Sequence, residues 1–142
     1  MQLGHGPVVF GEVLFDVFPD GTRVLGGAPF NVAWHLAALG LDPLMITRVG
    51  EDADGDAVLA RMKDWGMRTE GVQRDPERPT GQVQVMMEHG EPSYVIREDA
   101  AWDAITADAY PDPIQTRLLY HGTLATRTEA SAEALAQLQH HL

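Results

Sequence analysis

The sequence contains no cysteine among its 142 residues. This absence excludes disulfide bonds, thiolate nucleophiles and zinc sites built on cysteine. Positive charge is also scarce, because 10 lysines and arginines stand against 21 aspartates and glutamates and leave a formal net charge of −11. A chain this acidic repels phosphate backbones and anionic lipids unless its basic residues gather in one patch, and no such patch is evident. We therefore expect no nucleic acid and no membrane among its partners.

Long apolar runs are missing as well. No stretch approaches the roughly 20 consecutive apolar residues that a membrane-spanning helix needs. The N-terminus has neither the basic flank nor the uninterrupted apolar run of a signal peptide, so a cytoplasmic location is expected. Hydrophobic residues nevertheless make up 44% of the chain, which is enough for one globular domain with a core.

Several motifs of catalytic and metal sites are also absent. The sequence has no GxxxxGK[ST] or GxGxxG nucleotide loop, no Gly-x-Ser-x-Gly elbow and no HExxH pair. The acidic run 51–56 resembles a calcium loop, but Ala57 stands where an EF-hand requires glycine and Lys63 where it requires glutamate. We interpret this run as the capped start of a helix and predict no metal site.

The apolar pattern predicts strands that alternate with helices. We expect strands at 7–18 (bent by a bulge at Gly11), 23–25, 44–49, 69–74 and 117–121, and helices at 29–40, 54–65 and 129–141. This alternation is typical of a mostly parallel sheet with helices on its faces, an α/β fold.

Residues 80–97 interrupt the alternation. Polar and apolar residues alternate over 81–88, turn residues follow at 89–92, and a second strand pattern returns at 93–97. This arrangement predicts an antiparallel hairpin. We expect the hairpin to join the strands at about 12–25 in a small separate sheet that acts as a lid.

The stretch VLGGAPFNVA at 24–33 is the first candidate binding element. Glycines before a helix let a ligand approach the unpaired N–H groups of its first turn, and the Asn31 amide can both donate and accept hydrogen bonds. An ordinary glycine turn with Asn31 on the exposed side of the helix explains these residues equally well. Asp16 ends an apolar strand, so its carboxylate needs a ligand hydroxyl, a backbone N–H or a cation, or it closes the turn that follows.

Taken in order, six stretches resemble the ribokinase-like (PfkB) carbohydrate kinases, and within them the fructokinase-like branch. The stretches are GEVLFDVFP, LGGAPFNVAWHLAALG, ITRVGEDADGDAVLARMKDWG, PTGQVQVMM, SYVIREDAAWDAI and YHGTLATR. The resemblance implies a mostly parallel sheet flanked by helices, a small antiparallel lid, and transfer of a phosphoryl group from ATP, with Mg²⁺, to a sugar hydroxyl. A kinase for another sugar or a nucleoside, and a non-catalytic sugar-binding or oligomerisation module, remain open alternatives.

The resemblance also implies which residues contact the sugar. Asp16 would accept hydrogen bonds from sugar hydroxyls, and the glycine backbone with Asn31 would hold others. Three lid positions are expected to face the substrate as well. The complete expected set of substrate-binding residues is Asp16, Gly26, Gly27, Asn31, Gln84, Tyr94 and Arg97.

One segment of the family is missing from the sequence. The second half of such kinases carries a Gly-Ala-Gly-Asp segment that supplies an anion hole and the catalytic base, and this chain has none. We therefore expect residues 1–142 to be the N-terminal part of such a kinase, without the ATP-binding and catalytic half, and to be inactive alone. No catalytic residue is expected in this chain. A homodimer through the lid strands or through an exposed sheet is expected, since an incomplete sheet leaves apolar surface uncovered.

Overall fold

The first apolar segment forms two strands, not the single bent strand expected from its sequence. In the computed structural model, which describes residues 6–142, β1 (Val8–Phe10) and β2 (Leu14–Val17) lie in different sheets. Gly11, between them, has a φ of 151°, and a Cβ at this position would lie 2.4 Å from Cγ of Pro29. The chain therefore leaves one sheet at Gly11 and enters the other, which corrects the expected bulge. Residues 1–5, on which the expectation about export partly rests, lie outside the described residues.

The first sheet is wholly parallel and has the strand order β5-β4-β1-β8. Its other strands are β4 (Leu44–Gly50), β5 (Val72–Asp75) and β8 (Leu119–His121). β5 begins three residues later than expected because the Val72 N–H donates to the carbonyl of Thr69 and closes a turn. β8 lies at an edge of the sheet, where Leu118 and Tyr120 are exposed.

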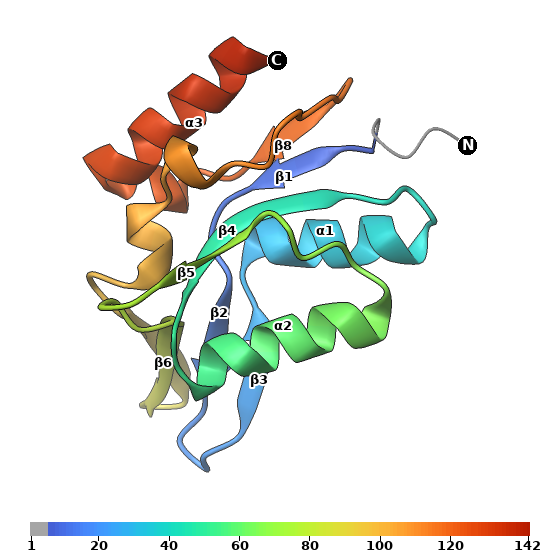
Figure 1. Cartoon of the computed structure of the whole chain (residues 1–142). Helices are drawn as coiled ribbons and strands as arrows, with labels where there is room; N and C mark the ends of the chain where they lie inside the picture. The colour runs from blue at the N-terminus through green and yellow to red at the C-terminus, as the bar shows by residue number, and fades with distance from the viewer. Residues whose placement is uncertain (1–5) are drawn as a thin grey trace.

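Helices cover both faces of this sheet, as Figure 1 shows. The helices are α1 (Ala28–Ala38), α2 (Ala53–Trp65) and α3 (Glu129–His141). Val9 and Met45 point from the strands into a core with α1 and α2, whereas Val8 and Ile46 point into a second core with α3. This two-sided burial explains why the strands are apolar at consecutive positions. The expected α/β architecture is thus confirmed.

The helix boundaries follow local signals in the sequence. The carboxylate of Asp52 accepts a hydrogen bond from the Gly55 N–H at 2.7 Å and caps α2, so the acidic run is a helix start as interpreted. Gly66 ends α2 in the left-handed conformation. Short 3₁₀ helices, η1 (Ala101–Ala104), η2 (Ala107–Ala109) and η3 (Leu124–Arg127), connect the sheets to β8 and α3.

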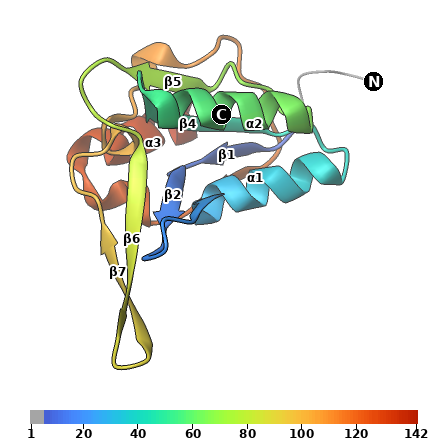
Figure 2. The same ribbon diagram turned by 90° about the horizontal axis from the view of Figure 1, so that it is seen from below.

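The second sheet has the order β3-β2-β6-β7 and projects from the body of the molecule (Figure 2). It contains β3 (Arg23–Gly26), β6 (Gly81–Glu88) and β7 (Glu91–Ile96) in addition to β2. β6 and β7 form the expected antiparallel hairpin, although its turn is shorter than expected and lies at His89–Gly90. β6 also pairs with β2, so the expected pairing with the strands at 12–25 is present.

The second sheet exposes apolar side chains. These are Phe18, beside the end of β2, and Val24, Met86, Met87, Tyr94 and Val95 on the strands. Within residues 6–142, no helix is long and apolar enough to cross a membrane.

Candidate functional site

The glycine pair lies where the two sheets meet, at the amino end of α1. Gly27 precedes the first residue of the helix and has a φ of 104°. A Cβ here would lie 2.6 Å from the carbonyl oxygen of Glu12, so the conformation and the space both require glycine. No side chain caps α1. The N–H groups of Ala28 and Phe30 therefore have no side-chain partner among the described residues, whereas Pro29 has no N–H. They lie at the positive end of the helix dipole, where a hydroxyl or an anion is favoured.

Asp16 lies beside this pair. It stands opposite Val24 in β3, and its Oδ2 lies 3.4 Å from the point that a Cβ of Gly26 would occupy. Among residues 6–142 no side chain forms a hydrogen bond or ion pair with the Asp16 carboxylate, and burial raises its pKa. The turn that follows is closed by Asp20, which accepts a hydrogen bond from the Thr22 N–H at 2.9 Å. Asp16 is thus a partly buried acceptor that the turn does not use.

Asn31 lies one helical turn after Gly27 and is exposed. It borders a hollow of about 170 Å³ that is also lined by Leu25, Phe30, Trp34 and Arg61. The Trp34 ring stacks on that of Trp65, with ring centroids 4.6 Å apart. Asn31 therefore borders a surface hollow whose lining does not include Asp16.

The register of the second sheet separates the three expected lid residues. In the register of the sheet, Asp16 pairs with Val83 of β6, and Tyr94 of β7 pairs with Val85 of β6. Val83 and Val85 are two residues apart on one strand, so Tyr94 and Asp16 share a face of the sheet. Gln84 lies between those two valines and points to the opposite face.

Arg97 is held elsewhere by hydrogen bonds. Its guanidinium donates to the Thr80 carbonyl at 3.1 Å and to Oε1 of Gln82 at 3.0 Å. The structure therefore places Asp16 beside Gly26 and Gly27, with Tyr94 farther along the same face. It does not bring Gln84 or Arg97 to Asp16, and contact of these two residues with a substrate stays a prediction.

Glu12 was missed by the sequence reasoning. It lies between β1 and β2, is 4% exposed, and its Oε2 has no hydrogen-bond partner among the described residues. Burial raises its pKa, against smaller opposing effects of a backbone hydrogen bond and of Arg127. A charged residue inside the apolar run VVFGEVLF was the available signal, since a buried carboxylate without a partner is costly.

A buried ion pair supports the base of the second sheet. Asp103 in η1 accepts hydrogen bonds from Nε and Nη2 of Arg127 at 2.8 and 2.7 Å, and Nη2 also donates to the Arg97 carbonyl. The guanidinium lies 4.2 Å from the centroid of the Trp102 ring, and a Cβ at Gly81 would meet Nε1 of that tryptophan. The end of β7, the start of β6 and the segment before α3 are thereby joined.

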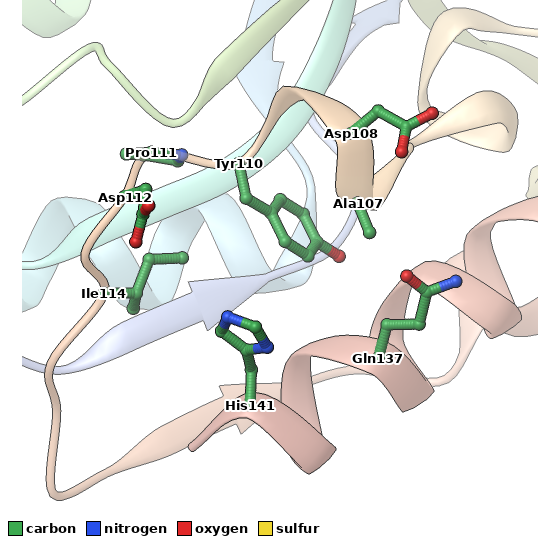
Figure 3. Close-up of a pocket in the computed structure, with 8 residues that line it drawn as sticks. All are labelled: Ala107, Asp108, Tyr110, Pro111, Asp112, Ile114, Gln137 and His141. Atoms are coloured by element: carbon green, nitrogen blue, oxygen red, sulfur yellow. The ribbon is translucent and has the colours of Figure 1, made fainter.

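A further pocket, of about 200 Å³, lies on the other side of the first sheet (Figure 3). It is lined by Ala107, Asp108, Tyr110, Pro111, Asp112, Ile114, Gln137 and His141. The Tyr110 hydroxyl donates to the Ala134 carbonyl of α3 at 2.6 Å and packs this segment against the helix. Because α3 and α1 cover opposite faces, this pocket is remote from the glycine pair.

Comparison with known proteins points to one family. The model described as pfkB family carbohydrate kinase matches residues 11–142. The fructokinase of Vibrio alginolyticus is 34% identical over 93 residues, which cover 62% of this chain and 30% of that protein.

Solved structures agree in fold. The ATP-bound fructokinase of Xylella fastidiosa superposes with a TM-score of 0.85 at 24% identity, over 94% of this chain and 44% of that one. The fructokinase of Vibrio cholerae, solved with fructose, ADP and calcium, gives a TM-score of 0.82 at 23% identity, over 99% of this chain and 47% of that one. This chain thus spans less than half of the length of each of these relatives.

Proposed function

The chain belongs to the pfkB family of carbohydrate kinases, and on this basis we propose that it forms the acceptor-binding part of an ATP-dependent sugar kinase. Fructose is the proposed acceptor. Two findings support it: relatives named fructokinase match the chain, and a fructokinase solved with fructose shares its fold. The second sheet is proposed to act as the lid over this acceptor.

The observation that carries the proposal is the position of Asp16 beside the glycine pair. The carboxylate accepts hydrogen bonds, whereas the N–H groups at the start of α1 donate them. A sugar hydroxyl both donates and accepts, so adjacent hydroxyls of one sugar can use both groups. The absence of a protein partner for Asp16 within residues 6–142 leaves its lone pairs available to such a ligand.

The chemistry of phosphoryl transfer requires more than this site. ATP and Mg²⁺ supply the phosphoryl group and neutralise its charge, and a base must accept the proton of the hydroxyl. Among the described residues there is no group of three or more His, Asp or Glu side chains that could hold a metal ion. We assign no residue of this chain to Mg²⁺ or to the nucleotide. The part of Asp16 is to bind and orient the acceptor, and we propose that the chain alone does not turn over.

Asp16→Asn tests the site. A lost hydrogen bond to a charged group costs about 1.5–3 kcal/mol, so fructose affinity should fall roughly 10- to 100-fold in titration calorimetry. Binding needs the carboxylate form. Because burial raises the pKa of Asp16, wild-type affinity should decline on acidification at a higher pH than an ordinary aspartate would dictate.

Asp20→Asn is the matched control for this experiment. It removes a carboxylate from the adjacent turn and should leave fructose affinity unchanged. An Asp16→Asn variant that binds as the wild type does would remove Asp16 from the site. Ribose and adenosine, titrated alongside, test the alternative acceptors, and tighter binding of either would replace fructose as the acceptor.

We also propose that two copies associate through their second sheets. The exposed apolar side chains of that sheet support this, because several exposed apolar side chains on one small projecting sheet favour association. Met87→Lys should shift the protein to monomer in sedimentation velocity, whereas Leu118→Lys, at the edge of the first sheet, should not. The opposite result would place the interface at β8.

A further inference from the structure

Asp54 connects the first turn of α2 to two strands of the second sheet. Its carboxylate forms an ion pair with Arg23 of β3 and accepts a hydrogen bond from Nε2 of Gln82 in β6 at 3.0 Å. The Asp54 side chain is 17% exposed, whereas that of Arg23 is 41% exposed. One partly buried carboxylate therefore joins α2 to strands on both sides of β2.

These contacts extend across the whole sheet. The Arg23 guanidinium lies 4.8 Å from the centroid of the Phe15 ring in β2, and Oε1 of Gln82 accepts a hydrogen bond from Arg97, just after β7. Phe15 pairs with Gln82 in the register, so their side chains share a face of the sheet. Asp16, the next residue after Phe15, points to the other face. The face opposite the candidate site is thus the one bound to α2.

The acidic residues close to Asp54, in the cap and the first turn of α2, make other contacts. Asp56 pairs with Arg74, and its side chain is 74% exposed. Asp52 caps the helix and accepts hydrogen bonds from the N–H and the hydroxyl of Thr80, at 2.9 and 2.6 Å, which holds the segment before β6. Of these three, Asp54 is the one bonded to side chains on the strands of the second sheet.

We propose that Asp54 is a positioning residue that fixes the second sheet on α2 and thereby holds Asp16 beside the glycine pair. The first part depends only on the contacts above, and the second part rests on the proposed function. Loss of the carboxylate leaves Arg23 and Gln82 without their shared partner. The strands β3 and β6 then lose their side-chain link to α2, while the contacts of Asp103 with Arg127 at the base of the sheet remain.

Asp54→Ala and Asp56→Ala form a matched pair, since each removes one carboxylate from the first turn of α2. In native-state hydrogen exchange, Asp54→Ala should raise the exchange rates of the amides in β3, β6 and β7 at least tenfold and leave those of β1 and β4 unchanged. Asp56→Ala should leave all of these amides at wild-type rates. Arg23→Met breaks the same ion pair from the strand side but keeps the hydrogen bond from Gln82 to Asp54, so it should raise the same exchange rates by a smaller factor. This second variant guards against an Asp54→Ala protein that misfolds.

Fructose affinity provides the second measurement. It should fall about tenfold in Asp54→Ala, stay unchanged in Asp56→Ala, and recover in Asp54→Glu, which restores the carboxylate. Wild-type exchange rates in both Asp54→Ala and Arg23→Met would overturn the anchoring role, whatever the acceptor is. Faster exchange with unchanged affinity would overturn the positioning role. Failure of the proposed function gives a different result, because Asp16→Asn would then leave fructose affinity unchanged.

Discussion

Replacing Gly27 with alanine is expected to lower the free energy of unfolding by roughly 3 kcal/mol or more. Gly27 has a φ of 104°, which a residue with a side chain adopts only under strain. The added Cβ would also lie 2.6 Å from the carbonyl oxygen of Glu12, a backbone atom that moves only if the connection between β1 and β2 moves. Urea unfolding followed by tryptophan fluorescence measures the change.

Gly21→Ala separates the two causes of this effect. Gly21 also has a positive φ, 86°, but no atom lies within 4 Å of its Cβ position. Its substitution therefore adds backbone strain without a collision and should cost only about 1 kcal/mol. Equal losses in the two variants would show that the contact with Glu12 contributes nothing.

Arg127→Leu is expected to destabilise the protein by about 3–5 kcal/mol. The substitution leaves the Asp103 carboxylate, whose side chain is 3% exposed, without its charged partner. It also removes the cation–π contact with Trp102 and the hydrogen bond to the Arg97 carbonyl. Thermal and urea unfolding both report this loss.

Arg68→Leu is the corresponding surface control. Arg68 pairs with Glu70, whose side chain is 49% exposed, so the variant should lose less than about 1 kcal/mol. Combining Arg127→Leu with Asp103→Leu should recover part of the stability, because no buried charge then lacks a partner. The alternative outcome is that Asp103→Leu costs as much stability in the Arg127→Leu background as it does in the wild type. The two substitutions are then independent, and loss of the ion pair does not cause the destabilisation.

Local patterns in the sequence predict most of the elements. The capping aspartate of α2, the proline in the first turn of α1 and the alternation in β6 act over a few residues, and these elements form where expected. The passage of the chain between sheets at Gly11 was not predictable in this way. It depends on Pro29, a residue 18 positions away, which packs against the glycine.

The candidate site was predictable only in part. Asp16 and the glycine pair come together because β2 and β3 are adjacent strands joined by a short turn. A two-residue period predicts that Gln84 and Tyr94 lie on strands of one hairpin, but it does not show which face of the sheet meets a ligand. The separation of Gln84 from Asp16 therefore needed the register of the folded chain. The pairing of Asp103 with Arg127 spans 24 residues and has no local signature, so only the folded chain reveals it.

The location of Asp16 within the second sheet has a mechanical consequence. Asp16 pairs with Val83, near the start of β6 and the base of the sheet. The hairpin turn at His89–Gly90 lies at the far end of the sheet (Figure 2). When a lever rotates about its base, displacement grows with distance from the axis. A tilt of this sheet therefore moves the hairpin tip much farther than it moves Asp16. Under the proposed function, access to the site can change while Asp16, the group proposed to bind the acceptor, stays almost in place.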